Sequence, residues 1–146
     1  MVQLSRPSRQ WGLELARVLI VDKDPASRLT LQTVLEAGGY RVDAASTAAE
    51  AVGKLEKAQY ELVLSDLQME SPAAGLRVLT YAKLMDYEPA TALLTTWQNS
   101  VLREQSDGSM LIATEDIPGL LTKVAHLIST RATRMVEREL EAAARN

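Results

Sequence analysis

Two short apolar runs, each ending abruptly in an aspartate, constrain the fold of this chain more than any other feature. The first covers residues 18–21 (Val-Leu-Ile-Val) and stops at Asp22; the second, Leu-Val-Leu at residues 62–64, lies in a predicted strand over 60–65 that stops at Asp66. An apolar run of this length is typical of a strand that is buried on both faces of a parallel sheet. The carboxyl ends of parallel strands lie at one edge of the sheet, so we expect both aspartates at that edge.

The rest of the chain alternates between strand and helix patterns. Strands are predicted over residues 17–21, 40–44, 60–65, 92–95 and 110–113. Helices are predicted from residue 25 to Gly38-Gly39, from Ser46 or Thr47 onward, over 76–87, over 97–104 as a short or broken helix, and from 117 to about 145. This order predicts an α/β fold with a doubly wound, five-stranded parallel sheet and right-handed crossovers. A functional crevice is then expected at the carboxyl ends of the strands.

Polar residues mark where two of these helices begin. Asp24 precedes Pro25, the order of an N-cap followed by proline at the first helical position. Ser46 or Thr47 opens the next helix, backed by Glu50. Capping is therefore a sufficient explanation for Asp24.

The last helix is longer than a closing helix of such a sheet requires. We expect an N-terminal extension over residues 1–16, one domain over 17–130, and an extension of the last helix over 131–146. Met135, Val136 and Leu140 stand among balanced charges in that extension. Two interpretations are open, a frayed solvated tail and a contact between two copies of the chain.

Composition excludes several classes of function. The chain has 146 residues, a net charge of −3 and no cysteine, so disulfides and thiolate metal sites are excluded. The negative charge disfavours a nucleic-acid partner. No stretch approaches the ~20 apolar residues that span a bilayer, so no membrane partner and a cytoplasmic location are expected.

The segments 18–25 and 62–69 together resemble the receiver domains of two-component signalling, and the match spans about residues 17–128. The resemblance implies a flavodoxin-like receiver fold. It also implies that an aspartate after the third strand accepts a phosphoryl group, that acidic residues after the first strand hold Mg²⁺, and that a fourth-strand hydroxyl and a fifth-strand lysine contact the phosphoryl oxygens. A carboxylate that attacks a phosphoryl group brings two anionic centres together, so cations must neutralise the developing charge.

Several positions match this pattern. Asp66 corresponds to the phosphoacceptor, Gln68 to the residue whose carbonyl completes the metal shell, and Asp22 to the first acidic residue. The switch hydroxyl falls on Thr95 or Thr96, with Thr95 preferred because Thr96 then takes the small-residue position after it. The resemblance thus implies Asp22, Asp66 and Gln68 as the metal ligands.

Other positions depart from the pattern. Lys23 replaces the second acidic residue, Ala113 stands where the phosphate-contacting lysine belongs, and Met110 replaces the switch aromatic. Thr114 replaces the usual proline. An ammonium group has no acceptor and cannot ligate Mg²⁺, so Lys23 puts the cofactor in doubt.

Lys23 has two interpretations. Its charge could pair with Asp66 or Asp22 and hold the pocket in a permanently neutralised state. Alternatively, Lys23 faces solvent and weak phosphorylation survives. A third arrangement, with Asp22 and Asp24 both facing an acidic pocket, ranks below capping by Asp24.

One residue is inserted after the acceptor relative to the family pattern. Met69 is followed by Glu70, with proline delayed to Pro72 and glycine to Gly75. The insertion brings the Glu70 carboxylate near the acceptor, unless that side chain is merely solvated.

The sequence therefore predicts a signalling domain and no enzyme. His126 is the only histidine and forms no triad, and no base accompanies Ser65. The favoured function is a degenerate receiver, a protein-interaction module that works without phosphorylation. The alternatives are an Mg²⁺-dependent phosphoacceptor loaded at Asp66 by a histidine kinase, and the N-terminal part of a larger transcriptional regulator. The expected partners are a histidine kinase or other signalling protein, and a second copy bound through the face of the fifth strand and last helix.

Overall fold

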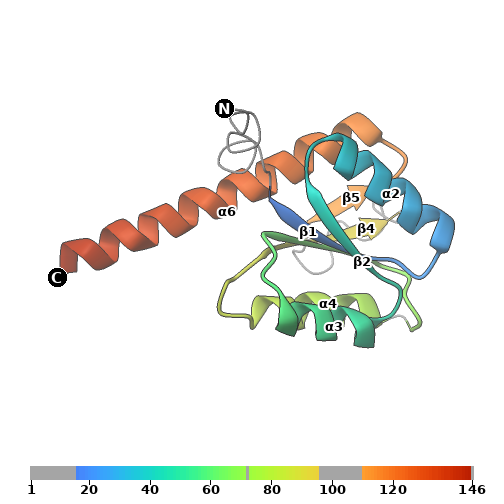
Figure 1. The fold of residues 1–146 in the computed structure, drawn as a ribbon, viewed down its shortest axis with the longest axis horizontal. Helices are drawn as coiled ribbons and strands as arrows, with labels where there is room; N and C mark the ends of the chain where they lie inside the picture. The colour runs from blue at the N-terminus through green and yellow to red at the C-terminus, as the bar shows by residue number, and fades with distance from the viewer. Residues whose placement is uncertain (1–15, 72, 96–109, 146) are drawn as a thin grey trace, which may run out of the picture.

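The computed structural model describes residues 16–71, 73–95 and 110–145, which form one parallel sheet with helices on both sides (Figure 1). The strands are β1 (Arg17–Val21), β2 (Arg41–Ala45), β3 (Leu62–Asp66), β4 (Ala90–Thr95) and β5 (Leu111–Ala113). The helices are α2 (Pro25–Ala37), α3 (Ala48–Lys57), α4 (Ala74–Lys83) and α6 (Ile117–Arg145). All strand pairs are parallel and the order is β2-β1-β3-β4-β5, which confirms the predicted fold class.

Each face of the sheet carries its own apolar core. α2 and α6 cover one face and α3 and α4 the other (Figure 1). Successive residues of a strand point to opposite faces, so Ile20 packs under α2 and α6 whereas Leu19 and Val21 pack under α3 and α4. Val18 to Val21 are all fully buried, which is why the sequence shows an unbroken apolar run there.

The predicted helix starts are confirmed by their caps. The Asp24 side chain accepts a hydrogen bond from the Ser27 N–H at 3.3 Å, and Thr47 caps α3 by accepting from the Glu50 N–H at 3.1 Å. Gly39 has a φ of 101°, a backbone conformation that favours glycine. The turn after α2 therefore needs the glycine pair that the sequence shows.

Several element boundaries differ from the prediction by one or two residues, and the largest difference is at the end of α4. The helix expected through Tyr87 ends at Lys83, because the chain must turn before Pro89 and Glu88 takes a φ of 46° there. The third strand begins at Leu62 rather than Tyr60. The helix predicted over 97–104 lies outside the described residues.

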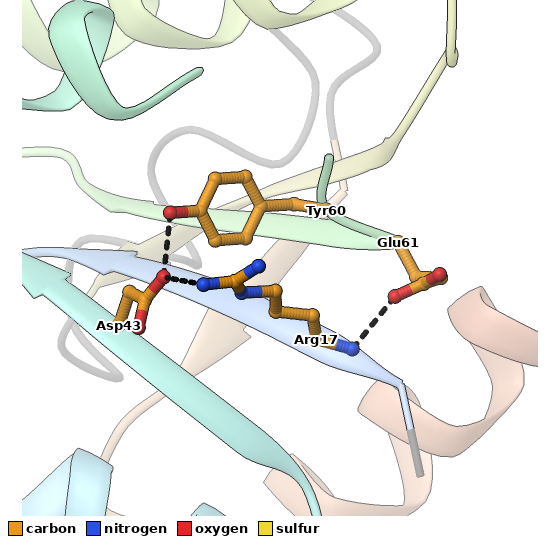
Figure 2. A network of polar contacts seen from close by, with 4 residues as sticks. All are labelled: Arg17, Asp43, Tyr60 and Glu61. Atoms are coloured by element: carbon orange, nitrogen blue, oxygen red, sulfur yellow. Dashed lines mark hydrogen bonds and ion pairs between the residues drawn. The ribbon is translucent and has the colours of Figure 1, made fainter. Parts of the chain in front are cut away.

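A polar network ties the amino ends of the strands together, and Figure 2 shows its four residues. The Arg17 guanidinium lies 3.1 Å from an Asp43 carboxylate oxygen, which also accepts a hydrogen bond of 2.7 Å from the Tyr60 hydroxyl. The Arg17 N–H donates to Glu61 at 2.6 Å. Burial, followed by the hydrogen bond to Asp43, raises the pKa of Tyr60, so its hydroxyl stays a neutral donor.

α6 is a single helix whose second half is anchored to the loop before β4. The Arg131 side chain donates to the carbonyl oxygens of Glu88 at 2.9 Å and Tyr87 at 2.5 Å. Arg138 forms an ion pair with the Glu88 carboxylate at 2.5 Å. These contacts argue against a tail that frays directly after residue 130. Beyond Arg138 the helix projects from the domain with Leu140 65% exposed (Figure 1).

Gly75 and Gly53 form a matched pair for testing helix packing. A Cβ at Gly75 would meet the Asp66 carbonyl oxygen at 2.3 Å, whereas a Cβ at Gly53 would meet nothing within 4 Å. We expect Gly75→Ala to lower the free energy of unfolding by about 1–3 kcal/mol, because α4 must move away from β3. Gly53→Ala should raise it by about 0.5–1 kcal/mol, since alanine favours a helix interior. Urea denaturation measures both, and equal stabilisation by the two substitutions would contradict the close approach.

The anchor of α6 is tested by comparing two arginines. Arg131→Met should lower the free energy of unfolding by about 1–2 kcal/mol, because it removes charged hydrogen bonds to two backbone carbonyls. Arg138→Met should have a smaller effect, since its ion pair with Glu88 is largely exposed and screened by solvent. Hydrogen exchange of the amides after residue 130 should become faster in Arg131→Met, and an unchanged rate would disprove the anchoring role.

Candidate functional site

A pocket of about 230 Å³ lies at the carboxyl end of the sheet. It is lined by Asp22, Lys23, Asp24, Ser27, Asp66, Gln68, Leu94, Thr95 and Thr114. A larger hollow of about 380 Å³ lies between α6 and the start of β4, but its only carboxylate, Glu88, already pairs with Arg138. The pocket at the strand ends is therefore the candidate functional site.

Two aspartates form the floor of this pocket. Asp22 follows β1 and is only 1% exposed, and its Oδ1 accepts a hydrogen bond from the Asp24 N–H at 3.0 Å. Asp66 ends β3, and its Oδ1 accepts from the Gln68 N–H at 3.0 Å. β1 and β3 are neighbours in the sheet, so the two carboxyl groups lie side by side at its edge.

The environment of Asp66 disfavours its charged form. Burial is the largest influence on Asp66 and raises its pKa; the Gln68 N–H lowers it, the Asp22 carboxyl raises it and Lys23 lowers it slightly, and the net result is a pKa of about 6. Desolvation and a like charge act in the same direction. Holding both carboxyl groups ionised is therefore costly unless a cation enters the pocket.

Lys23 lies at the pocket but does not supply that cation by direct contact. Its side chain is exposed, and in the described part of the chain it forms no ion pair with Asp22 or Asp66. Its effect on the pKa of Asp66 is the smallest of those acting there. The direct pairing expected for Lys23 is thus not found. Asp24 also lines the pocket, with one carboxylate oxygen engaged at the start of α2.

The far side of the pocket is formed by β4 and β5. Thr95 ends β4 beside Ala113 in the register, and it is 4% exposed. Its Oγ1 is buried and has no hydrogen-bond partner among residues 16–71, 73–95 and 110–145. Thr114 follows, and its hydroxyl donates to the Thr95 carbonyl at 3.4 Å. Thr96 lies outside the described residues.

The substituted positions on β5 offer the pocket no charge. Ala113 contributes only a methyl group and is 9% exposed. Met110 precedes the strand and is 37% exposed. A buried hydroxyl without a partner therefore lies beside an alanine.

The inserted residue after the acceptor acts outside the pocket. The Glu70 carboxylate accepts a hydrogen bond of 3.1 Å from the Ala48 N–H at the start of α3. Glu70 is not among the residues that line the pocket. The insertion therefore ties the loop after β3 to α3, and it adds no acidic group to the site.

The residues present match only part of the magnesium site that the resemblance implies. Asp22, Asp66 and the Gln68 backbone carbonyl are oxygen donors of the required kind. However, Lys23 takes the place of the second acidic residue, and no cluster of three or more acidic, histidine or cysteine side chains able to hold a metal occurs across residues 16–71, 73–95 and 110–145. Sequence reasoning missed Ser27 as a lining residue, although its place in the first turn of α2 beside the capping Asp24 could have indicated it.

Comparison with known proteins identifies the class of this domain. The response regulator receiver domain family matches residues 18–108, and the chain belongs to this family. No curated protein matches the chain. In the part that the structure describes, no helix is long and apolar enough to cross a bilayer.

Solved structures show the same fold. A CheY-like receiver domain from Methanospirillum hungatei is 27% identical, with a TM-score of 0.69 and coverage of 82% of this chain and 98% of that one. The response regulator TrrA from Thermotoga maritima, in complex with Mg²⁺ and BeF, is 26% identical, with a TM-score of 0.66 and coverage of 77% and 99%. The anti-anti-sigma factor PhyR from Bartonella quintana is 18% identical with a TM-score of 0.67; the match covers 97% of this chain but 56% of PhyR. The protein is a receiver domain of two-component signalling.

The raised pKa of Asp66 predicts a pH-dependent effect of Asp66→Asn. The pKa is 3.8 for an ordinary aspartate and about 6 in the fold, so ionised Asp66 destabilises the fold. This cost grows from about pH 4 to about pH 6 and is complete above pH 6. In EDTA we expect Asp66→Asn to raise the free energy of unfolding by about 1–2 kcal/mol at pH 7.5, and by less at pH 4.5.

Urea denaturation at the two pH values measures this gain. Glu139→Gln, which neutralises an exposed carboxylate on α6, is the control and should change stability little at either pH. A gain in Asp66→Asn that does not depend on pH would contradict the assigned cause.

Proposed function

We propose that this receiver domain works without phosphorylation, as a protein-interaction module of a two-component or phosphorelay system. The observation that supports the proposal most directly is that Lys23 lines the Asp66 pocket and Ala113 pairs with the lining residue Thr95, at two positions where the resemblance implies an acidic residue and a lysine. Both changes act on charge.

Lys23 disfavours the binding of a metal ion in the pocket. Its ammonium group has three donors and no acceptor, and a positive charge at the pocket repels a divalent cation. The two remaining carboxylates must bind the metal against this repulsion. Phosphoryl transfer to Asp66 would then lack the cation that offsets the meeting of two anions.

Ala113 cannot stabilise a phosphoryl group on Asp66. A methyl group cannot donate a hydrogen bond or carry charge, so a phosphoryl group on Asp66 would meet no cation from β5. The Thr95 hydroxyl is the group left to receive it. We therefore expect a phosphorylated state to be both slow to form and weakly stabilised.

The alternative is an Mg²⁺-dependent phosphoacceptor loaded at Asp66 by a histidine kinase. The matching residues Asp22, Asp66, Gln68 and Thr95 favour it, since all line one pocket. TrrA, which is 26% identical, was crystallised with Mg²⁺ and BeF. The phosphorylation-independent function is preferred because the alternative needs a metal beside Lys23.

Several further properties belong to the same proposal. We expect no enzymatic activity, a cytoplasmic location, and a histidine kinase or other signalling protein as the partner. A second copy could bind through β5 and the exposed side of α6, where Val136 and Leu140 are 53% and 65% exposed. The long α6 also suits the alternative in which this domain belongs to a larger regulator.

Restoring the two family residues gives a direct test. With acetyl phosphate and millimolar Mg²⁺, the natural chain should gain no phosphoryl mass on Asp66, whereas Lys23→Asp combined with Ala113→Lys should gain it. Intact mass spectrometry measures loading, and ¹⁹F NMR of beryllofluoride measures analogue binding. The control is the double variant carrying Asp66→Ala, which should not load. Loading of the natural chain at a rate near that of the double variant would refute the proposal in favour of the phosphoacceptor.

A further inference from the structure

We propose that the pocket at Asp22 and Asp66 binds the ammonium group of a lysine side chain from a partner protein. The inference rests on the proposed interaction function and names the chemistry of the partner. The pocket would then recognise a protein directly, by taking a cation from it.

The two carboxylates give the pocket a negative charge that favours binding of a cation from another molecule. Asp22 is 1% exposed and Asp66 is partly buried, so both are partly removed from water. In the described part of the chain, Lys23 forms no ion pair with either of them. A cation placed between the two carboxylates would gain two charge-assisted hydrogen bonds in a site that water screens poorly.

The acceptors match an ammonium group in number. Asp22 and Asp66 each use Oδ1 to accept a backbone N–H, and their carboxyl groups also lie within hydrogen-bonding reach of each other, so an ammonium group would take the remaining oxygens in place of that contact. The third acceptor is Thr95 Oγ1, which is buried, has no hydrogen-bond partner in the described part of the chain and belongs to a residue lining the same pocket. An ammonium group has three donors, one for each acceptor.

The positions of the acceptors favour lysine over arginine. The three acceptors lie at the ends of three neighbouring strands, β1, β3 and β4, and are therefore not in the plane of a single carboxylate. The planar guanidinium fork is best suited to the two oxygens of one carboxylate, whereas an ammonium is a compact point charge with three rotatable donors. Mg²⁺ is a poorer occupant, since it demands near-octahedral oxygen coordination and loses water reluctantly.

The space for this group lies beside Ala113. The pocket measures about 230 Å³, and Ala113 adjoins Thr95 in the register. A lysine introduced at residue 113 would start next to Thr95 and could deliver its own ammonium to the same acceptors. Ala113→Lys is therefore an internal competitor for the proposed ligand.

The test uses butylammonium, a mimic of the lysine side chain, titrated in EDTA at pH 7.5 and constant ionic strength. Amide chemical shifts in ¹⁵N-labelled full-length protein report binding. We expect saturable shifts at Lys23, Asp24, Leu67 and Gln68, next to the two aspartates. Tetramethylammonium has the same charge and no N–H donor, and it should produce no saturable shift.

Four variants locate the site. Ala113→Lys should abolish the saturable shifts, and Asp66→Asn should raise the dissociation constant about tenfold through loss of a charged hydrogen bond. Thr95→Val keeps the side-chain shape and should raise it several-fold. Lys23→Ala should lower it, because a repelling charge is removed. Thermal denaturation of each variant confirms folding, and Thr95→Val keeps the test valid if Ala113→Lys does not fold.

The outcomes separate this inference from the proposed function. Binding that persists unchanged in Ala113→Lys and Asp66→Asn, or equal shifts with tetramethylammonium, would overturn the lysine site. That result would leave phosphorylation independence intact, since acetyl phosphate loading measures it separately. Loading of Asp66 in the natural chain would instead overturn the proposed function, whatever butylammonium does.

Discussion

The structure depends on the burial of β1 and β3 side by side in the middle of a parallel sheet. Their register pairs Val21 with Ser65, so the next residue of each strand, Asp22 and Asp66, emerges at the same level of the same edge. Helices cover both faces of the sheet, and at this edge Asp22 is 1% exposed and Asp66 is partly buried. The apolar core thus determines that two carboxyl groups share one poorly solvated place.

That constraint makes neutralisation the central question for the site. In the family pattern that the resemblance implies, a metal ion and a lysine on the fifth strand would neutralise the carboxylates. In the proposed function Lys23 and Ala113 alter both, while the two aspartates and the buried Thr95 hydroxyl stay in place. Keeping the acceptors while losing the cations leaves a pocket whose electrostatics favour a charge from elsewhere.

The opposite end of the sheet has its charges paired within the chain. Asp43 is paired with Arg17 and hydrogen-bonded to Tyr60, and the Glu88 carboxylate is paired with Arg138. α6 connects the two ends, because it begins shortly after β5 and reaches the loop before β4. The pocket contrasts with this, since its aspartates hydrogen-bond to backbone N–H groups and have no side-chain cation in contact in the described residues.

The sheet and the site residues could be predicted from the sequence because both depend on local patterns. Apolar runs identify buried strands, and an aspartate directly after each run lies at the strand end whatever the details of packing. The direction of Lys23 could not be predicted, because it depends on where the chain turns after β1 to let Asp24 cap α2. The role of Glu70 could not be predicted either, because its partner Ala48 is distant in the sequence. The cap formed by Asp24 is local and follows from the sequence, whereas the contact between Glu70 and Ala48 is tertiary; with Glu70 held outside the pocket, Asp22 and Asp66 are the carboxylates at its floor.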